Sequence, residues 1–269
     1  MKTGIIGIGN MGSAILKSML SSGVCDAKNI NIFDINEQSL EPFKNTGVVI
    51  HTSGSDAARA SDCLILVTKP QNMRETLSGI KNGLRKETVI VSIAAGLGED
   101  FFTKALGRKP KLALVMPNTP LLLGEGATAL SKAGRINDTE FEYVRKIFAS
   151  SGKTIVFDKA QMNSIIALNG SSPAFIYLFA KGFIQYAKDV GLDEKSSLEL
   201  FCASLTGAAC MMTDSGHNID ELIKIVSSPG GTTVAGLKTF GDADFTDIVV
   251  KACNSVNRRA QELAQEYSD

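Results

Sequence analysis

A glycine-rich segment near the start of the chain has the residue types that bind a dinucleotide pyrophosphate. Gly7-Ile8-Gly9-Asn10-Met11-Gly12 follows a short apolar run and begins a helix-like stretch. In this spacing Gly7 allows a tight turn, Gly9 lets backbone approach the pyrophosphate, and Gly12 permits close helix packing. The amides at the start of the helix attract phosphate. A strand before the motif and a helix after it therefore favour a dinucleotide site over a purely structural turn.

An acidic residue follows at the position that reads the adenosine ribose. Asp34 ends the second apolar run, about twenty residues after the last glycine. A carboxylate there accepts hydrogen bonds from the ribose hydroxyls and repels a 2′-phosphate, which favours NADH over NADPH. Asn36 can form a hydrogen bond with either cofactor. Alternatively, Asp34 has no role in cofactor binding and only caps the helix that follows. The sequence leaves the cofactor as NADPH or NADH.

Three further segments follow later apolar runs, at the strand ends where open α/β sheets bind ligands. Small residues and a rigid proline turn in these segments suit a flat nicotinamide ring. Lys69 either contacts a phosphate or ribose or is a solvated surface lysine. The segments are Thr68-Lys69-Pro70, Ser92-Ile93-Ala94-Ala95-Gly96 and Met116-Pro117-Asn118-Thr119-Pro120.

A loop in the second half of the chain has the composition of an anion site. In Ser227-Ser228-Pro229-Gly230-Gly231-Thr232-Thr233, proline and two glycines set a tight loop before a helical pattern. Backbone amides at such a helix start bind anions, and the hydroxyls of Ser228, Thr232 and Thr233 add donors. A small carboxylate is the expected ligand. The alternative is an ordinary helix cap with a Pro-Gly turn.

The elements that must position these residues divide the chain in two. Over residues 1–157 short, continuously apolar runs alternate with helix-like stretches, which predicts a parallel α/β sheet. Residues 127–130 and 153–157 are expected to add edge strands. The other predicted strands are Lys2–Ile6, Ile30–Phe33, Val48–Ile50, Cys63–Val67, Val89–Ile93 and Leu112–Met116. The helices predicted between them are Met11–Ser22, Gln71–Leu84, Glu99–Leu106 and Asp138–Ser150.

Residues 158–269 show no strand pattern and are predicted to form a second, all-α domain. Leu198–Met212 is apolar nearly all the way round, as in a helix buried on every side. We expect it to form an intersubunit core in a homo-oligomer; the alternative is the central helix of a monomeric bundle. The predicted helices are Ala160–Leu168, Pro173–Val190, Glu194–Ser215, Ile219–Val226, Thr232–Phe240 and Phe245–Tyr267.

Composition excludes several function classes. Lys plus Arg and Asp plus Glu are both 28, so no basic excess indicates a nucleic-acid or membrane partner. No apolar run reaches the ~18–20 residues of a membrane span, and the first residues lack the features of a secretory signal. Five scattered cysteines and two histidines argue against a disulfide framework or a metal site. We expect a cytoplasmic protein that acts on a small molecule.

In these motifs the chain resembles pyrroline-5-carboxylate reductases. The resemblance extends over essentially the whole length in one order, through Ile5–Gly12, Lys69-Pro70, Ser92–Gly96, Met116–Pro120 and Gly170-Ser171-Ser172-Pro173-Ala174. Its most specific part is Ser228–Thr233 with the following Ala235-Gly236-Leu237. The glycine-rich start alone is shared with many dehydrogenases.

The resemblance implies reduction of the cyclic imine 1-pyrroline-5-carboxylate to L-proline, the final step of proline biosynthesis, by NADPH or NADH. It implies a Rossmann domain, a helical dimerisation domain and active sites between subunits. The substrate carboxylate would bind Ser228 and the amides of Gly230, Gly231 and Thr232. Thr233 matches the threonine that bonds the imine nitrogen and is the expected catalytic residue. The expected cofactor-binding residues are Gly7, Ile8, Gly9, Asn10, Met11, Gly12, Asp34, Thr68, Lys69, Pro70, Ala94, Ala95, Gly96 and Asn118.

The chain departs from the family pattern at four positions, and two other functions stay open. Asn169 and Ser172 replace a serine and a glycine, and Gly54 and Ile225 stand where the family often has asparagine. One alternative is a β-hydroxyacid dehydrogenase, whose catalytic lysine would match Lys159 with Asn163 four residues on. This alternative gives the segment Ser227–Thr233 no role. The other alternative is a dinucleotide-binding sensor without catalysis.

Overall fold

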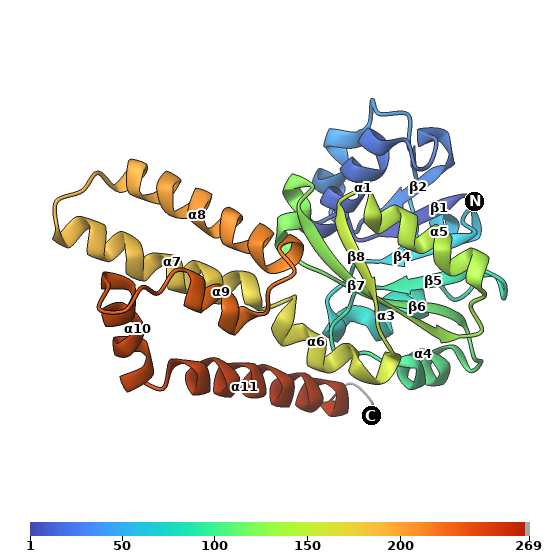
Figure 1. The fold of residues 1–269 in the computed structure, drawn as a ribbon. Helices are drawn as coiled ribbons and strands as arrows, with labels where there is room; N and C mark the ends of the chain where they lie inside the picture. Colours follow the sequence, from blue (N-terminus) through green and yellow to red (C-terminus); the bar gives the residue numbers. More distant parts are fainter. Residues whose placement is uncertain (267–269) are drawn as a thin grey trace. The chain divides into compact units, whose positions relative to one another are not determined.

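A computed structural model describes residues 1–266 (Figure 1). Contacts divide the chain into two compact units: Met1–Pro173 with the chain from Ser255 onward, and Ala174–Asn254. This division differs from the predicted boundary at residues 157 and 158. Two helices explain the difference, because α6 (Met162–Leu168) adds side chains to the core of the sheet unit and α11 (Phe245–Glu266) ends near Gly96.

The first unit is built on an eight-stranded sheet in the order β3-β2-β1-β4-β5-β6-β7-β8. Strands β1 to β6 are parallel and in register along continuous apolar runs. Their predicted bounds are confirmed to within one residue at each end. The strands are β1 (Thr3–Ile6), β2 (Ile30–Phe33), β3 (Val49–Ile50), β4 (Cys63–Leu66), β5 (Val89–Ser92) and β6 (Lys111–Pro117).

The last two strands run the other way. β7 (Gly126–Gly134) pairs antiparallel with β6, and β8 (Gly152–Val156) is parallel to β7. The expectation that residues 127–130 form an edge strand is therefore wrong, since β7 lies between β6 and β8. The connection from β6 holds only a short 3₁₀ helix, η4 (Thr119–Leu123). A parallel crossover needs about a dozen residues or more.

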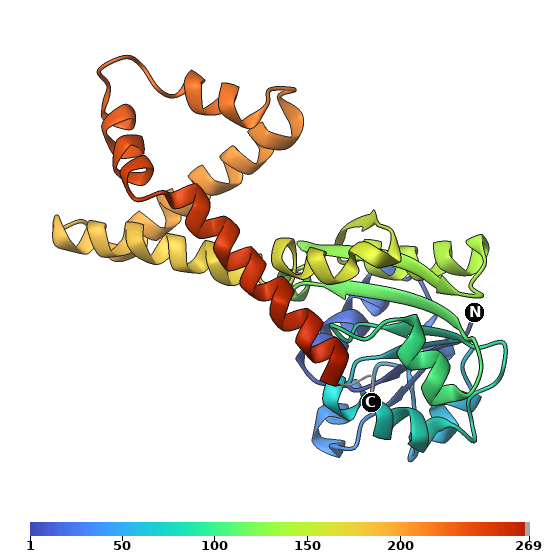
Figure 2. The same ribbon diagram turned by 90° about the horizontal axis from the view of Figure 1, so that it is seen from below.

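Alternate strand residues face two separate cores, one on each side of the sheet. Ile5 lies in one core and Ile6 in the other, both under 5% exposed. One face is covered by α1 (Asn10–Ser22) and α5 (Asp138–Ala149). The other is covered by α2 (Gly54–Arg59), α3 (Met73–Ile80), α4 (Glu99–Leu106) and α6 (Figures 1 and 2). Cover on both faces explains why the strands are apolar throughout.

The strand order reverses between β1 and β4. In a doubly wound sheet the carboxyl ends of the strands flanking such a reversal border the ligand crevice. The chain leaving β1 there is the glycine-rich segment, and the chain leaving β2 begins with Asp34. The topology thus brings the two parts of the predicted cofactor motif to one edge of the sheet.

The second unit is helical, and the described part of the chain after Val156 contains no strand, as predicted. Five phenylalanines pack together within this unit, and the ring centroids of Phe183 and Phe201 lie 4.6 Å apart. Its helices are α7 (Ser172–Asp189), α8 (Glu194–Asp214), α9 (Ile219–Ile225), α10 (Thr232–Asp242) and the first part of α11. Across residues 1–266, no helix is long and apolar enough to cross a membrane.

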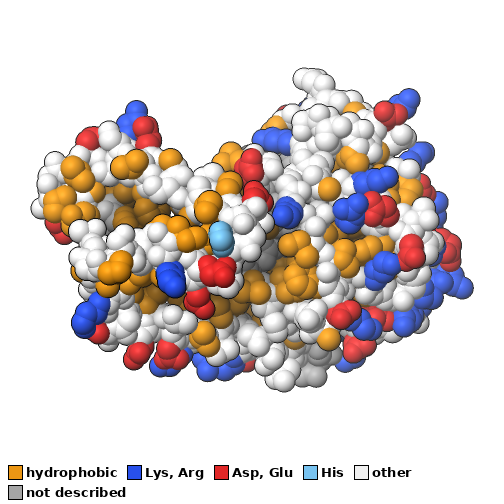
Figure 3. All heavy atoms as spheres, in the orientation of Figure 1, with side chains coloured by type: hydrophobic (Ala, Val, Ile, Leu, Met, Phe, Trp, Pro, Cys, Tyr) orange, Lys and Arg blue, Asp and Glu red, His pale blue; other side chains and the backbone are white. Residues whose placement is uncertain are grey.

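Helix α8 is not covered by the other helices of its unit. None of its residues is buried, and Leu200 and Met212 are 72% and 53% exposed. Hydrophobic side chains are visible on the surface of this unit in Figure 3. The alternative that Leu198–Met212 is the central helix of a monomeric bundle is therefore wrong.

Candidate cofactor and substrate sites

The glycine-rich turn after β1 has the backbone geometry that only these glycines allow. Gly7 has φ of 97°, and its N–H donates to the Phe33 carbonyl at 3.0 Å. A Cβ on Gly7 would lie 2.6 Å from the Val67 carbonyl oxygen, and one on Gly12 would overlap the Gly7 carbonyl. A Cβ on Gly9 would meet nothing within 4 Å. The turn is thus tight on its inner side and open at Gly9.

The start of α1 keeps its backbone donors available. Gly9 is the N-cap residue and forms no side-chain capping bond. The first intrahelical bond shown there runs from the Ser13 N–H to the Gly9 carbonyl at 2.8 Å. The first-turn amides of Asn10, Met11 and Gly12 therefore have no intrahelical acceptor. Together with the open side of Gly9, they fit a dinucleotide pyrophosphate.

The Asp34 carboxylate lies directly against this turn. Its Oδ2 accepts from the Ile8 N–H at 2.5 Å, and its Oδ1 accepts from the Asn36 N–H at 2.8 Å. The following 3₁₀ helix, η2 (Glu37–Phe43), is capped by Asn36, whose Oδ1 accepts from the Gln38 N–H at 3.2 Å. Asp34 is thus not the cap of the following helix, and its half-buried carboxylate is fixed beside the glycine turn.

The three other predicted cofactor segments all follow parallel strands at the same sheet edge. Thr68 is half-buried beside Thr76, with their hydroxyls 3.3 Å apart, and Lys69 is exposed. The Ala94 N–H donates to Ser92 Oγ at 3.3 Å. Gly96 has φ of 80°, and a Cβ there would lie 3.4 Å from the Ala260 carbonyl of α11. Gly96 thus allows close helix packing at this edge.

Asn118 is held at the same edge by its side-chain oxygen. Its Oδ1 accepts from the Ala127 N–H at 2.9 Å. Asn169, one of the departures from the family pattern, donates through Nδ2 to the Met116 carbonyl at 2.5 Å and the Ala127 carbonyl at 3.1 Å. Asn169 is 8% exposed. This clamp between β6 and β7 joins residues far apart in the sequence, and no local pattern indicates it.

The predicted anion loop lies in the second unit, between α9 and α10. Gly230 has φ of 72°, and the Gly231 N–H donates to the Ser228 carbonyl at 2.9 Å. The Gly231 amide is therefore used by the turn itself, unlike the expectation that it points to a ligand. Gly231 is also the N-cap of α10 and forms no side-chain capping bond. The first-turn amides of Thr232 and Thr233 have no intrahelical acceptor.

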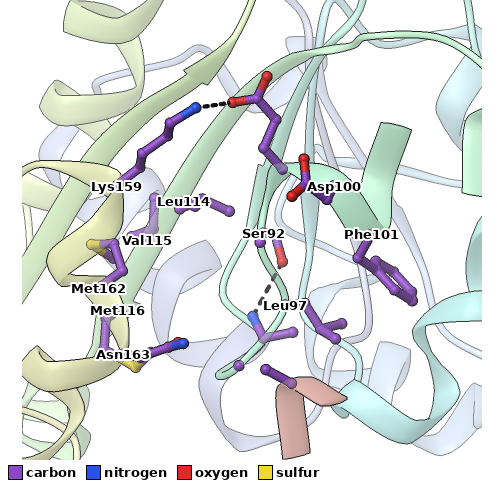
Figure 4. Close-up of a pocket in the computed structure, with 15 residues that line it drawn as sticks. Ser92, Leu97, Asp100, Phe101, Leu114, Val115, Met116, Lys159, Met162 and Asn163 are labelled. Carbon is purple, nitrogen blue, oxygen red and sulfur yellow. Dashed lines mark hydrogen bonds and ion pairs between the residues drawn. The ribbon is translucent and has the colours of Figure 1, made fainter. Parts of the chain in front are cut away.

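A cavity of about 230 Å³ lies in the first unit between α4, α6 and the ends of β5 and β6 (Figure 4). At its rim the Lys159 ammonium lies 2.6 Å from the Glu99 carboxylate, the ion pair drawn dashed in Figure 4. Lys109 binds the same carboxylate at 2.9 Å. Hydrogen bonds from Lys159 and Lys109 lower the pKa of Glu99 to about 2, and Glu99 raises the pKa of Lys159. A paired, protonated lysine is a poor general base, which disfavours the β-hydroxyacid dehydrogenase assignment of Lys159 and Asn163.

Two family models match the chain, one in each part. The model described as pyrroline-5-carboxylate reductase dimerisation matches residues 159–263. The model described as NADP oxidoreductase, coenzyme F420-dependent, matches residues 2–96. Together these matches follow the order of the sheet-forming and helical parts of the chain.

Curated proteins and solved structures match over nearly the whole length. The pyrroline-5-carboxylate reductase of Methanosarcina acetivorans is 30% identical over 98% of both chains. That of Pisum sativum is 31% identical over 97% of this chain and 95% of its own. The crystal structure of a Plasmodium falciparum pyrroline carboxylate reductase with NADP bound has a TM-score of 0.89 and 28% identity, covering 98% of both chains. A Coxiella burnetii pyrroline-5-carboxylate reductase has a TM-score of 0.89 and 27% identity, covering 97% of this chain and 98% of its own.

Proposed function

The chain belongs to the pyrroline-5-carboxylate reductase family, and on that premise we propose that it reduces 1-pyrroline-5-carboxylate to L-proline with NAD(P)H, as the final step of proline biosynthesis. The observation that carries this proposal is 30% identity over 98% of both chains to a curated reductase. The open, uncapped glycine turn supports it independently, because its shape fits a dinucleotide.

The carboxyl edge of the first unit's sheet would hold the cofactor. The amides at the start of α1 would bind the pyrophosphate and Asp34 the adenosine ribose. Thr68-Lys69-Pro70 would line the path between the two halves of the cofactor. Ala94, Ala95 and Asn118 would position the nicotinamide, which supplies the hydride when bound. Because Asn118 Oδ1 already accepts from Ala127, its Nδ2 amide group is the part left to donate to a ligand.

The loop between α9 and α10 would hold the substrate. The Ser228 hydroxyl and the amides of Gly230 and Thr232 would bind the carboxylate, while Gly231 closes the turn that presents them. The Thr233 hydroxyl oxygen would accept a hydrogen bond from the N–H of the protonated imine. In the reaction the imine carbon gains a hydride, and the nitrogen keeps its proton as the amine of proline. A protonated imine is already electrophilic, so orientation is the larger contribution of the protein.

The exposed apolar surface of the second unit supports a homo-oligomer. A helix with no buried residue and large apolar side chains, such as α8, would be costly to leave in water. A second copy of the chain can cover these side chains. We therefore propose a homodimer or a ring of dimers, consistent with the dimerisation family that matches residues 159–263. We also propose a cytoplasmic enzyme, in which the five cysteines stay as free thiols.

The test is a steady-state assay of the purified chain with 1-pyrroline-5-carboxylate, following the oxidation of NADH and NADPH by absorbance. We expect oxidation that depends on the imine and yields proline. Oxidation of 3-hydroxyisobutyrate without imine reduction would instead support a β-hydroxyacid dehydrogenase. Tight nucleotide binding without turnover of either substrate would support a non-catalytic sensor.

A further inference from the structure

We propose that this chain selects NADH over NADPH and that Asp34 sets the selection. The inference rests on the proposed function, because it concerns the cofactor of that same site. The glycine turn and the end of β2 lie together within the first unit.

The Asp34 carboxylate has a fixed position. Both oxygens of Asp34 accept from backbone amides, at 2.5 Å from Ile8 and 2.8 Å from Asn36. Asp34 is therefore fixed at the turn that would bind the pyrophosphate. In this position its carboxylate would lie within hydrogen-bonding reach of the adenosine ribose. Each carboxylate oxygen accepts about two hydrogen bonds, so each retains a site for a ribose hydroxyl.

The loop that follows Asp34 supplies no basic side chain to the ribose position. Residues 35 to 43 contain no lysine or arginine. Lys44 is paired with Glu41 at 2.5 Å, and Arg59, after the next strand, is paired with Asp56 at 2.6 Å. A 2′-phosphate beside Asp34 would therefore meet a negative charge and no basic side chain from this loop. Lys69 follows β4, on the other side of β1 from β2.

The residue after Asp34 presents an apolar side chain at the surface. Ile35 is 91% exposed, although isoleucine is among the residue types most often buried. It follows the ribose-reading position directly, where an adenine ring can cover it. An apolar side chain can pack against the adenine ring, and it offers neither a charge nor a hydrogen bond to a 2′-phosphate. Asp34 and Ile35 together thus match adenosine with a free 2′-hydroxyl.

The experiment compares kcat/KM for NADH and NADPH in the wild-type chain and in variants at this loop. We expect the wild type to prefer NADH by about tenfold or more. Asp34→Asn removes the charge and one of the two acceptor oxygens, and Asp34→Ser shortens the side chain; both should lower the NADH to NADPH ratio by about tenfold. Ile35→Arg, which adds a cation without touching the Ile8 contact, should lower the ratio through a smaller KM for NADPH.

The matched control is Asp26→Asn. Asp26 is an exposed acid just before the other end of β2, so removing its charge should leave the ratio unchanged. A wild-type preference for NADPH, or a ratio that neither Asp34 variant changes, would overturn the inference and leave imine reduction standing. Binding of each nucleotide without substrate, followed by nucleotide fluorescence, tests the preference separately. If nucleotides bind and the imine is not reduced, the proposed function fails, and the binding ratio still decides the role of Asp34.

Discussion

Asn118 and Asn169 bind opposite sides of one residue, Ala127. Asn118 accepts from the Ala127 N–H at 2.9 Å, and Asn169 donates to the Ala127 carbonyl at 3.1 Å. Asn169 also donates to the Met116 carbonyl. The two asparagines thus connect the end of β6, the start of β7 and the end of α6, and the bond from Ala127 leaves the Asn118 Nδ2 group free for a ligand.

The clamp formed by Asn169 should be needed for stability. Asn169→Ala leaves two backbone carbonyls without this donor, and we expect it to lower the free energy of unfolding by about 1–3 kcal/mol. Denaturant unfolding at pH 7 measures the change. The control is Ser164→Ala on the exposed side of α6, which should leave the midpoint unchanged. Equal midpoints for the two variants would contradict the clamp.

Thr233 should matter for turnover and not for folding. Its side chain is exposed in the single chain, so Thr233→Ala should keep the unfolding midpoint. We expect kcat to fall by about tenfold or more, because the imine N–H loses its hydrogen-bond partner. Steady-state kinetics with saturating cofactor measures this loss. Thr239→Ala, on the same helix, should retain full kcat; an unchanged kcat in Thr233→Ala would reject the assigned role.

A side chain at Gly231 should disrupt the anion loop. A Cβ there would lie 2.9 Å from the Ser228 carbonyl oxygen, the acceptor of the Gly231 turn bond. Gly231→Val should therefore open the turn and raise KM for the imine, with KM for the cofactor unchanged. Gly241→Ala is the control, because a Cβ at Gly241 meets nothing within 4 Å. Wild-type KM for the imine in Gly231→Val would show that the turn is not required.

The Glu99 ion pairs should give stability that depends on pH. Two lysines lower the pKa of Glu99 to about 2. Their contribution to the free energy of unfolding is therefore fully present above the ordinary glutamate pKa, and it is lost as pH falls toward 2. Glu99→Gln should be less stable than the wild type at pH 7, by about 1 kcal/mol since both lysines are more than half exposed. The difference should shrink between pH 5 and pH 3.

Denaturant midpoints at these pH values test this pH dependence, with the exposed Glu125→Gln as control. A difference that stays constant with pH would exclude the ion pairs as its source.

The exposed face of α8 should hold subunits together. Leu200→Asp places a charge on a side chain that is 72% exposed in the single chain, and we expect it to shift the protein from dimer to monomer. Sedimentation velocity measures the assembly state. Lys195→Asp, on the same helix, also introduces an acid but at an already charged position, so it should remain dimeric. A monomeric wild type would contradict the proposed assembly.

The parts of the fold that local sequence determines were predictable. β1 to β6 were predictable because strands covered on both faces must be apolar throughout. The glycine turn was predictable because Gly7 and Gly12 occupy positions where any Cβ would collide with backbone. The same reasoning found Asp34, because its place at the end of β2 follows from the strand alone.

The parts that depend on tertiary contacts were not predictable. Helix α2 is short, begins with Gly54 and has no apolar period; the Ser53 cap and the burial of Ala57 and Ala58 stabilise it. The direction of β7 depends on the length of its connection, which composition does not show. The Asn169 clamp joins backbone groups 42 and 53 residues away. The engaged amide of Gly231 depends on how the loop closes on Ser228.

Because β7 is reversed, α6 must return the chain to the nucleotide edge of the sheet, and this requirement fixes the length of the helix. β8 leads the chain away from the nucleotide edge, and α6 must bring it back so that Asn169 reaches the Met116 carbonyl. Removing one turn would shorten this path by about 5.4 Å, more than a hydrogen bond can absorb. Insertions or deletions in this helix should therefore be tolerated poorly, even though it carries none of the residues assigned to cofactor or substrate.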